Sequence, residues 1–484
     1  MKQLILFGGL LICLLSCKQE QKNEVTISGK ISESAVREIT FSLLTDNLTN
    51  TDENNYTAKI DSLSQFSITI PIKQLTEARI ILGNGYHEMC FLPGDSLQIE
   101  IVGQEMIRYK GKGAGKNNLL FASEVKWFKD SMSKIISNVD VELKDFPDSA
   151  KSFLQSQTAL LNKFDKEEKL EPEFKKFFLL KYDHSYSGML FDYSRSYAVK
   201  NKIALNSLEL PAEYVKLRQF KNVINDKMLS LGGYRTLIMN LFYEKRYKIL
   251  SADTTLKMKK IDQTLLFDSL TGKTRDYMLT RYFISQLSAN QFDSVFYNKY
   301  LETVKDTTYN KAVKRSFDKY KLRIGIIGKP LNSEFSETLV EDTSNTQITF
   351  GKMMEKYKGK VVFLDLWSLN CGPCRANMPY SHQLKEELKG LPIEFVYIAQ
   401  DPPAKDVWEK IFKVTLTDQN QYRMVDYKWG SSRMLKLLEI NFVPCYMIFD
   451  KEGKLVDYNA QQPSMKNMKG ELVIGTRLKK LAEL

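Results

Sequence analysis

Two cysteines separated by two residues form the pair with the clearest chemistry in this 484-residue sequence, in the run Cys371-Gly372-Pro373-Cys374. The stretch from Val361 to Leu366 before them is apolar except for Asp365 and predicts a buried strand, and we expect a helix to begin within the four-residue turn. At a helix start this spacing lets the sulfurs close a disulfide and places the first sulfur beside unpaired amides, which favour a thiolate. We therefore expect Cys371 to be the nucleophile of disulfide exchange and Cys374 to resolve the mixed disulfide.

The residues around this pair resemble the thioredoxin superfamily, and within it the TlpA-like thiol:disulfide oxidoreductase lipoproteins of the Bacteroidota type. The resemblance is carried, in chain order, by Asp365, Trp367, the Cys371-Gly372-Pro373-Cys374 core, Arg375 and Pro379. It implies that Asp365 is a buried carboxylate, which is either a satisfied core group or the proton acceptor for Cys374. The Gly-Pro insert is that of thioredoxin, whose reducing potential of about −270 mV favours a reductase.

Two positions depart from the pattern. Asn370 stands before the first cysteine, where tryptophan is usual, and Asn377 stands where the TlpA group often has glutamate. Both lie where a partner protein would dock, so the resemblance does not carry over the choice of substrate.

A second signature runs from Leu438 to Asp450 and contains Val443, Pro444 and Cys445. The resemblance implies a cis peptide bond before Pro444, beside the disulfide, and a following strand that aligns a partner backbone. The implied substrate-binding set is Trp367, Asn370, Gly372, Pro373, Val443 and Pro444, with Trp367 expected mainly to pack. Cys445 is expected to fill a buried site, although it could also trap a wrong disulfide.

Other functions of the two cysteines are weighed against this one. A zinc half-site would need a second cysteine pair or clustered histidines, and the chain has only three histidines, so we expect no metal. A structural disulfide or a remnant without redox activity stays open. The redox-active Cys371–Cys374 disulfide replaces any separate cofactor.

The N-terminus predicts export. Residues 1–16 contain a lysine and then an apolar run too short to span a bilayer, as in a signal peptide. Leu14-Leu15-Ser16-Cys17 resembles a lipobox, which implies lipidation of Cys17 and a tether over residues 17–23; ordinary secretion with an incidental Cys17 is the alternative. We expect a lipid-anchored protein of the cell envelope that faces the periplasm.

The rest of the sequence predicts a multidomain chain. Alternating β-branched runs over residues 24–110 predict an N-terminal all-β, sandwich-like domain. Residues 111–323 predict a central all-α domain, because stretches such as 213–231 carry apolar residues three and four apart. The resemblance implies a C-terminal α/β thioredoxin fold over residues 324–484. The strand–helix–strand order there predicts a parallel pair of buried strands with helices on both faces, and the turn at residues 451–454 predicts an antiparallel pair.

The sequence thus predicts an envelope-anchored oxidoreductase that reduces protein disulfides. Its expected partners are protein thiols and disulfides and a membrane electron donor. The formal charge of +12 comes from dispersed lysines without a long basic run, so a nucleic-acid partner is not expected. The alternative is a surface binding or scaffold lipoprotein whose thioredoxin module is vestigial or purely structural.

Overall fold

The computed structural model describes residues 23–32, 36–44, 48, 54–82, 85–103, 106–129, 132–205, 207–253, 255–402, 406–417, 419–427, 431–466 and 470–484. The predicted signal peptide, Cys17 and the tether up to residue 22 lie outside these residues. The chain divides into two compact units, an N-terminal unit of residues 1–281 and a C-terminal unit of residues 282–484.

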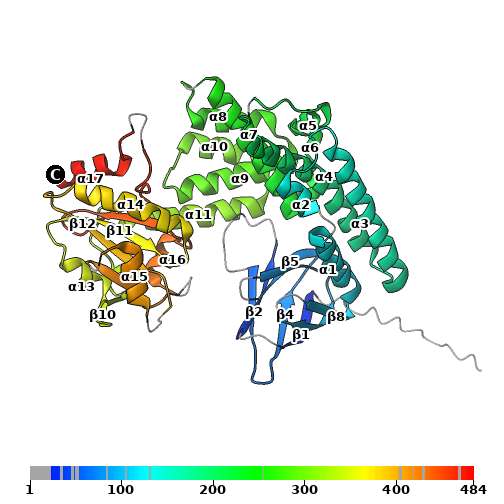
Figure 1. Cartoon of the computed structure of the whole chain (residues 1–484), viewed down its shortest axis with the longest axis horizontal. Coiled ribbons are helices and arrows are strands. Elements are labelled where there is room, and N and C mark those ends of the chain that lie inside the picture. Colours follow the sequence, from blue (N-terminus) through cyan, green and yellow to red (C-terminus); the bar gives the residue numbers. More distant parts are fainter. Residues whose placement is uncertain are drawn as a thin grey trace, which may run out of the picture. The chain divides into compact units, whose positions relative to one another are not determined.

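The described part of the N-terminal unit begins with two four-stranded sheets, ordered β4-β1-β7-β8 and β3-β2-β5-β6 (Figure 1). Val25 and Ile99 from the first sheet share one core with Phe41 and Ile80 from the second, because alternate residues of each strand face inward. The predicted sandwich-like β region is therefore confirmed. The strands are β1 (Glu24–Ser32), β2 (Glu38–Leu43), β3 (Asn55–Lys59), β4 (Gln65–Pro71), β5 (Thr76–Leu82), β6 (Gly85–Phe91), β7 (Ser96–Val102) and β8 (Met106–Lys112).

A helical region follows, as the sequence predicted. Helix α9 crosses the division between the two units, and α10 and α11 belong to the C-terminal unit. The helices are α1 (Ala114–Lys129), α2 (Met132–Asn138), α3 (Phe146–Glu168), α4 (Pro172–Lys200), α5 (Ala212–Leu217), α6 (Phe220–Val223), η2 (Asp226–Met228), α7 (Gly232–Ala252), α8 (Met258–Thr264), η3 (Leu265–Ser269), α9 (Gly272–Ser288), α10 (Ser294–Thr303) and α11 (Thr307–Ile326).

Residues 213–231, whose apolar spacing indicated helix, do not form one continuous helix. They are divided into α5, α6 and the 3-10 turn η2. The Asn225 side chain accepts a hydrogen bond from the Lys227 amide, and Asp226 accepts hydrogen bonds from the amides of Lys273 and Thr274. These side-chain bonds to the backbone compete with helix formation, which the apolar spacing alone does not reveal.

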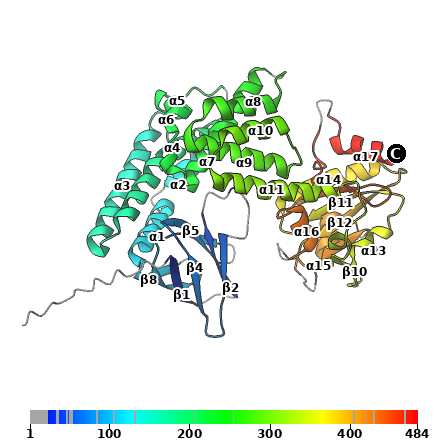
Figure 2. The ribbon, with the colours of Figure 1, turned by 180° about the vertical axis from the view of Figure 1, so that it is seen from behind.

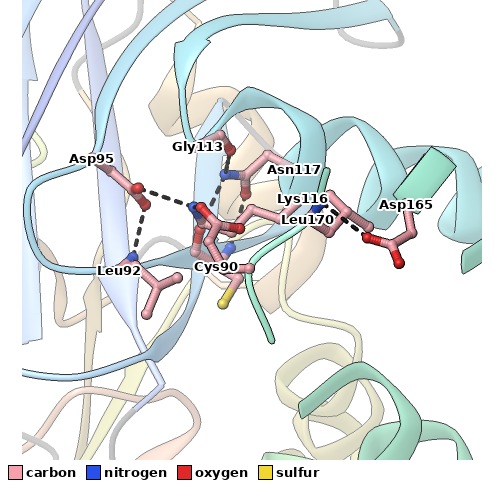
Figure 3. A network of polar contacts seen from close by, with 9 residues as sticks. Cys90, Leu92, Asp95, Gly113, Lys116, Asn117, Asp165 and Leu170 are labelled. Atoms are coloured by element: carbon pink, nitrogen blue, oxygen red, sulfur yellow. Dashed lines mark hydrogen bonds and ion pairs between the residues drawn. The ribbon is translucent and has the colours of Figure 1, made fainter. Parts of the chain in front are cut away.

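A buried ion pair joins α1 to the β region (Figure 3). Lys116 is fully buried, and its Nζ donates to Asp95 Oδ1 at 2.9 Å and to Glu171 Oε1 at 3.0 Å. Asp95 Oδ2 also accepts from the Leu92 amide at 2.7 Å. Burial raises the pKa of Asp95 while the Lys116 ammonium lowers it, so this carboxylate depends on the lysine for its charge.

The neighbouring Asn117 binds the edge of strand β6. Its side-chain oxygen accepts from the Cys90 amide at 2.9 Å, and its Nδ2 donates to the Cys90 carbonyl at 3.0 Å. Burial raises the pKa of the Cys90 thiol well above its ordinary value. Cys90 is therefore a packed, neutral thiol, as expected for a small buried cysteine.

The C-terminal unit contains a seven-stranded sheet ordered β10-β9-β13-β12-β11-β14-β15. The predicted parallel pairing of the two central strands is confirmed for β11 and β12, and the predicted antiparallel pair is β14 with β15. The elements are α12 (Ser333–Ser336), β9 (Leu339–Asp342), β10 (Gln347–Thr349), α13 (Phe350–Glu355), β11 (Val361–Trp367), α14 (Gly372–Glu387), β12 (Ile393–Ala399), α15 (Val407–Thr415), β13 (Gln421–Met424), α16 (Arg433–Leu438), β14 (Cys445–Phe449), β15 (Leu455–Asp457) and α17 (Val473–Glu483).

Helices cover both faces of this sheet (Figure 2). Leu364 and Leu366 of β11 pack in one core, which includes residues of α13 and α16. Phe363 and Trp367 point to the opposite face and pack in a second core, which includes residues of α14 and α17. Strand β11 is therefore buried from end to end, and α14 starts five residues beyond it.

Replacing Lys116 with methionine is expected to destabilise the β region by about 3–5 kcal/mol, because Asp95 would keep a buried charge without its cation. Hydrogen exchange of the β7 amides measures this loss as a lower opening free energy. Lys151→Met is the matched control, since Lys151 is half exposed and its ion pairs are worth less than about 1 kcal/mol. Equal small effects of the two substitutions would contradict a stabilising role for the buried pair.

Candidate active site

The two cysteines form a disulfide at the first turn of α14. Their Cα atoms are 5.2 Å apart. Cys371 is the N-cap residue of the helix, and its Sγ accepts a hydrogen bond from the Cys374 amide at 3.1 Å. Cys371 is partly exposed, whereas Cys374 is fully buried. One sulfur can thus be reached from outside, while the other is held within the core.

The loop before Cys371 is fixed by Asp401, which lies two residues beyond the end of β12. Asp401 is buried and accepts hydrogen bonds from Ser368 Oγ and from the Leu369 amide, both at 2.9 Å. Ser368 in turn accepts the Cys371 amide at its carbonyl oxygen, at 3.0 Å. Asp401 was not predicted from the sequence, although its position just after a strand parallel to β11 places it at the same edge of the sheet.

Asp365 lies inside the sheet on the side of the second core. Its neighbours in register are Tyr397 on β12 and Tyr446 on β14, and residues in register point to the same face. All three side chains are buried. Within the part of the chain that the structure describes, neither Asp365 oxygen and neither tyrosine hydroxyl has a hydrogen-bond partner.

This environment changes the charge state of the carboxyl group. Burial raises the pKa of Asp365 to about 8. The group is therefore largely neutral at pH 7, and it becomes a carboxylate when the pH rises through that value. The sequence left two interpretations of Asp365. A buried carboxyl group with all its hydrogen bonds made does not match the structure, since neither oxygen has a partner among the described residues.

Val443 and Pro444 are joined by a cis peptide bond, and both are partly buried. The following residue, Cys445, pairs in register with Leu366 of β11, so the two residues before it lie toward the end of β11 that leads to the disulfide. Val443 and Cys371 pack against the same core. Cys445 is buried, its Sγ donates to the Tyr458 carbonyl at 3.2 Å, and burial raises its pKa to about 12.

The other predicted residues separate into two groups. Asn370, Gly372 and Pro373 are exposed beside Cys371. Trp367 is fully buried in the second core, which favours the packing role over contact with a substrate. 

Asn377 is a residue whose contacts the sequence did not indicate. Its Nδ2 donates to the Pro373 carbonyl at 3.0 Å, and its Oδ1 accepts from the Ser464 amide at 3.2 Å. It therefore connects the active-site turn to the segment before α17. The expectation that Asn377 lies where a partner protein would dock is wrong, because its side chain is buried and bound within the domain.

The N-terminal unit contains a separate cavity of about 780 Å³, lined by residues of β5, β6, α1, α4 and α7. In its wall Lys181 donates to Glu77 Oε1 at 2.5 Å and to Glu88 Oε2 at 2.7 Å, and the guanidinium of Arg79 lies 4.5 Å from the ring centre of Tyr86. These charged groups are already engaged with other protein groups. This cavity is one place in the described part of the unit for the binding function that the sequence left as an alternative.

The described residues also show whether a metal site or a membrane-spanning helix is present. Among the described residues, no three histidine, cysteine or acidic side chains gather as a metal site would require. None of the described helices is both long enough and apolar enough to cross a bilayer.

Comparison with known proteins agrees with the geometry around the disulfide. Residues 337–472 match the Redoxin family model. The thiol-disulfide oxidoreductase ResA of Bacillus thuringiensis strain Al Hakam is 28% identical over 158 residues, which cover 32% of this chain and 80% of that protein. Residues 337–472 form a redoxin domain of the thiol-disulfide oxidoreductase class.

Solved structures are similar to about a third of the chain. The thioredoxin domain of a thiol-disulfide oxidoreductase from Bacteroides vulgatus is 19% identical, with 32% of this chain and 99% of that chain covered and a TM-score of 0.25. A thiol:disulfide interchange protein from Bacteroides sp. is also 19% identical, with 30% and 86% covered and a TM-score of 0.25. Exchange with protein thiols and disulfides is what the family of the redoxin domain implies.

Asp365→Asn is expected to stabilise the oxidised redoxin domain at pH 7. The pKa of Asp365 is raised by burial from 3.8 to about 8, so the folded chain binds one more proton than the unfolded chain between these values. The free energy of unfolding therefore falls as the pH rises through that window, by about 1.4 kcal/mol per pH unit. The total loss reached at pH 7 is on the order of 4 kcal/mol. Asparagine keeps the shape and removes this penalty.

Hydrogen exchange of the β11 amides at pH 5 and pH 7 measures the gain. The gain in stability should be much smaller at pH 5, because pH 5 lies closer to 3.8, the pKa of Asp365 in the unfolded chain. Tyr397→Phe, which leaves the carboxyl group in place, serves as the control. An equal gain at both pH values, or none at pH 7, would contradict the raised pKa.

Proposed function

We propose that this protein is a lipid-anchored thiol:disulfide oxidoreductase of the cell envelope that reduces disulfides in other proteins. The observation that carries the proposal is the asymmetry of the pair at the start of α14, with Cys371 accessible and Cys374 buried. Such a pair suits a nucleophile that meets a partner and a second thiol that acts only from within.

In the reduced protein the Cys371 thiolate would attack one sulfur of the substrate disulfide. A bond forms between Cys371 Sγ and that sulfur, and the substrate's other sulfur leaves as a thiolate that takes up a proton. The position of Cys371 at the N-cap supports the thiolate, because the Cys374 amide already donates to this sulfur and the helix dipole is positive there.

Cys374 would complete the exchange. After losing its proton it attacks Cys371 Sγ, the mixed disulfide breaks, and the substrate leaves as a dithiol. Two electrons have then passed to the substrate, and the Cys371–Cys374 disulfide is formed. A dithiol of a membrane electron donor must return two electrons and two protons before the next cycle.

Asp365 is the candidate acceptor for the proton of Cys374. Both belong to the same side of the sheet, since Cys374 packs with Phe363 and Trp367 and Asp365 shares their face of β11. A group with a pKa of about 8 can both accept and release a proton near neutral pH. The Asp365→Asn variant is therefore also expected to slow the loss of the Cys374 proton.

A substrate is expected to dock over the exposed side of the disulfide. Asn370, Gly372 and Pro373 lie on one side of it, and Val443 and Pro444 are the expected site for the substrate backbone. The direction of electron flow is proposed from the Gly-Pro insert, which is that of a reducing thioredoxin.

The location is proposed from the sequence before residue 24. Residues 1–16 have the features of an export signal, and Cys17 stands where a lipid would be attached. Cys17→Ser is expected to move the protein from the membrane fraction to the soluble envelope fraction. Unchanged membrane retention would contradict anchoring through this cysteine.

The exchange itself is tested with Cys374→Ser and Cys371→Ser. Cys374→Ser should accumulate a mixed disulfide with a protein substrate, such as insulin, because the second step is blocked. Cys371→Ser should form none, and both variants should lose turnover by at least about a thousandfold, as expected when a nucleophile or its partner is removed. Non-reducing electrophoresis with mass mapping identifies the adduct.

The matched control is Cys445→Ser, which removes a buried thiol next to Pro444. It should retain turnover within a factor of two and form the adduct at Cys371 when combined with Cys374→Ser. An adduct at Cys445, or equal adduct formation in both active-site variants, would be incompatible with the proposed order of attack.

A further inference from the structure

Arg323 of α11 is buried although it is charged, and it precedes the segment that matches the redoxin family. Its exposed fraction is 1%. Its guanidinium forms an ion pair with the carboxylate of Glu439, and Nη2 donates to the Leu287 carbonyl at 2.9 Å. Lys319, one turn earlier on α11, binds the same carboxylate at 2.6 Å. A buried guanidinium with this degree of pairing fixes the groups around it.

Glu439 is the residue from which the chain turns toward the active site. It caps the C-terminus of α16 in the left-handed conformation, with φ of +56°. Five residues later the chain reaches Pro444. Arg323 and Lys319 therefore hold the start of the segment 439–445, which carries Val443 and Pro444.

The other end of this segment is held through Tyr458. The Tyr458 carbonyl accepts the Cys445 thiol at 3.2 Å, and its hydroxyl lies 3.1 Å from the Ser288 carbonyl and 3.0 Å from Asn290 Oδ1. The Arg323 guanidinium lies 6.0 Å from the centre of the Tyr458 ring. Ile326 at the end of α11 packs in the core that also contains Cys445 and Tyr458.

All of these groups lie within the C-terminal unit. From them we infer that the end of α9 and helix α11 form a brace that holds segment 439–445 in the position where it receives substrate, with Arg323 and Tyr458 as positioning residues. The helices before the redoxin domain are then part of its substrate-binding apparatus. The expected effect of the brace on turnover rests on the proposed function. Its expected effect on the position of segment 439–445 rests on geometry alone.

The test compares Arg323→Met and Tyr458→Phe with the full-length protein. Methionine keeps much of the side-chain length without the charge, and phenylalanine keeps the ring without the hydroxyl. Lys314→Met is the matched control on α11, because its ion pair with Asp318 is exposed and far less constrained. Hydrogen exchange over residues 440–450 and insulin reduction with dithiothreitol as electron source are measured for each.

The brace predicts at least tenfold faster exchange over residues 440–450 in both variants, with β12 amides unchanged. It also predicts at least a fivefold higher KM for insulin, while kcat and the equilibrium constant of the Cys371–Cys374 couple against glutathione stay within a factor of two of wild type. Lys314→Met should match wild type in every measurement. Tyr458→Phe serves as the second variant because it removes only a hydroxyl group. It should therefore disturb the fold as a whole less than Arg323→Met, which removes a buried charge.

Unchanged exchange over residues 440–450 in both variants would overturn the inference. So would a uniform increase of exchange through β11 and β12 in both variants, because that describes loss of the fold and not of a brace. If the wild-type protein fails to reduce insulin, the proposed function fails, and local exchange in the two variants still decides whether the brace exists.

Discussion

The site depends on the meeting of a fully buried strand with the N-terminus of a helix. Strand β11 is packed on both faces, so its end is fixed in the sheet, and α14 begins five residues later with Cys371 as its N-cap. The amide that the first turn leaves unpaired is satisfied by a sulfur. Because the same amide and the helix dipole also favour a thiolate, the arrangement that stabilises the helix start also supports the role proposed for Cys371 as the nucleophile.

The second constraint is a buried acid that lacks protein partners among the described residues. Asp365 breaks an otherwise apolar strand and lies between two buried tyrosines on the face where Cys374 packs. Such a group costs stability at neutral pH, as its raised pKa shows. A costly group on the face of the sheet where Cys374 packs supports the proposed proton transfer within the core. It also distinguishes this face of β11 from the purely apolar face formed by Leu364 and Leu366.

Local sequence was sufficient for features whose causes are local. The buried strand before Cys371, the helix start at the cysteine pair and the β-rich opening followed from apolar periodicity and turn residues. The order of strands and helices also predicted the parallel pairing of β11 with β12. The division of residues 213–231 did not follow, since Asp226, in the 3-10 turn η2, is held by bonds to Lys273 and Thr274, more than forty residues away.

The same reason explains what was missed at the site. Tyr397 and Tyr446 become neighbours of Asp365 only through strand register, and Asp401 reaches Leu369 only because β12 lies beside β11. Arg323 meets Glu439 across more than a hundred residues of sequence. Contacts of this kind are set by tertiary packing, so neither spacing nor composition reveals them.

The central claim is that Cys371 and Cys374 form a reversible reducing couple, and it is tested most directly by equilibrating the mature protein with a series of glutathione redox buffers. We expect one two-electron transition with a midpoint near the thioredoxin value of about −270 mV, absent in variants that lack either cysteine. A midpoint near the value of about −120 mV of a strong oxidant would reverse the direction of electron flow. Absence of a reversible couple, or pairing of Cys371 with Cys445, would contradict the account.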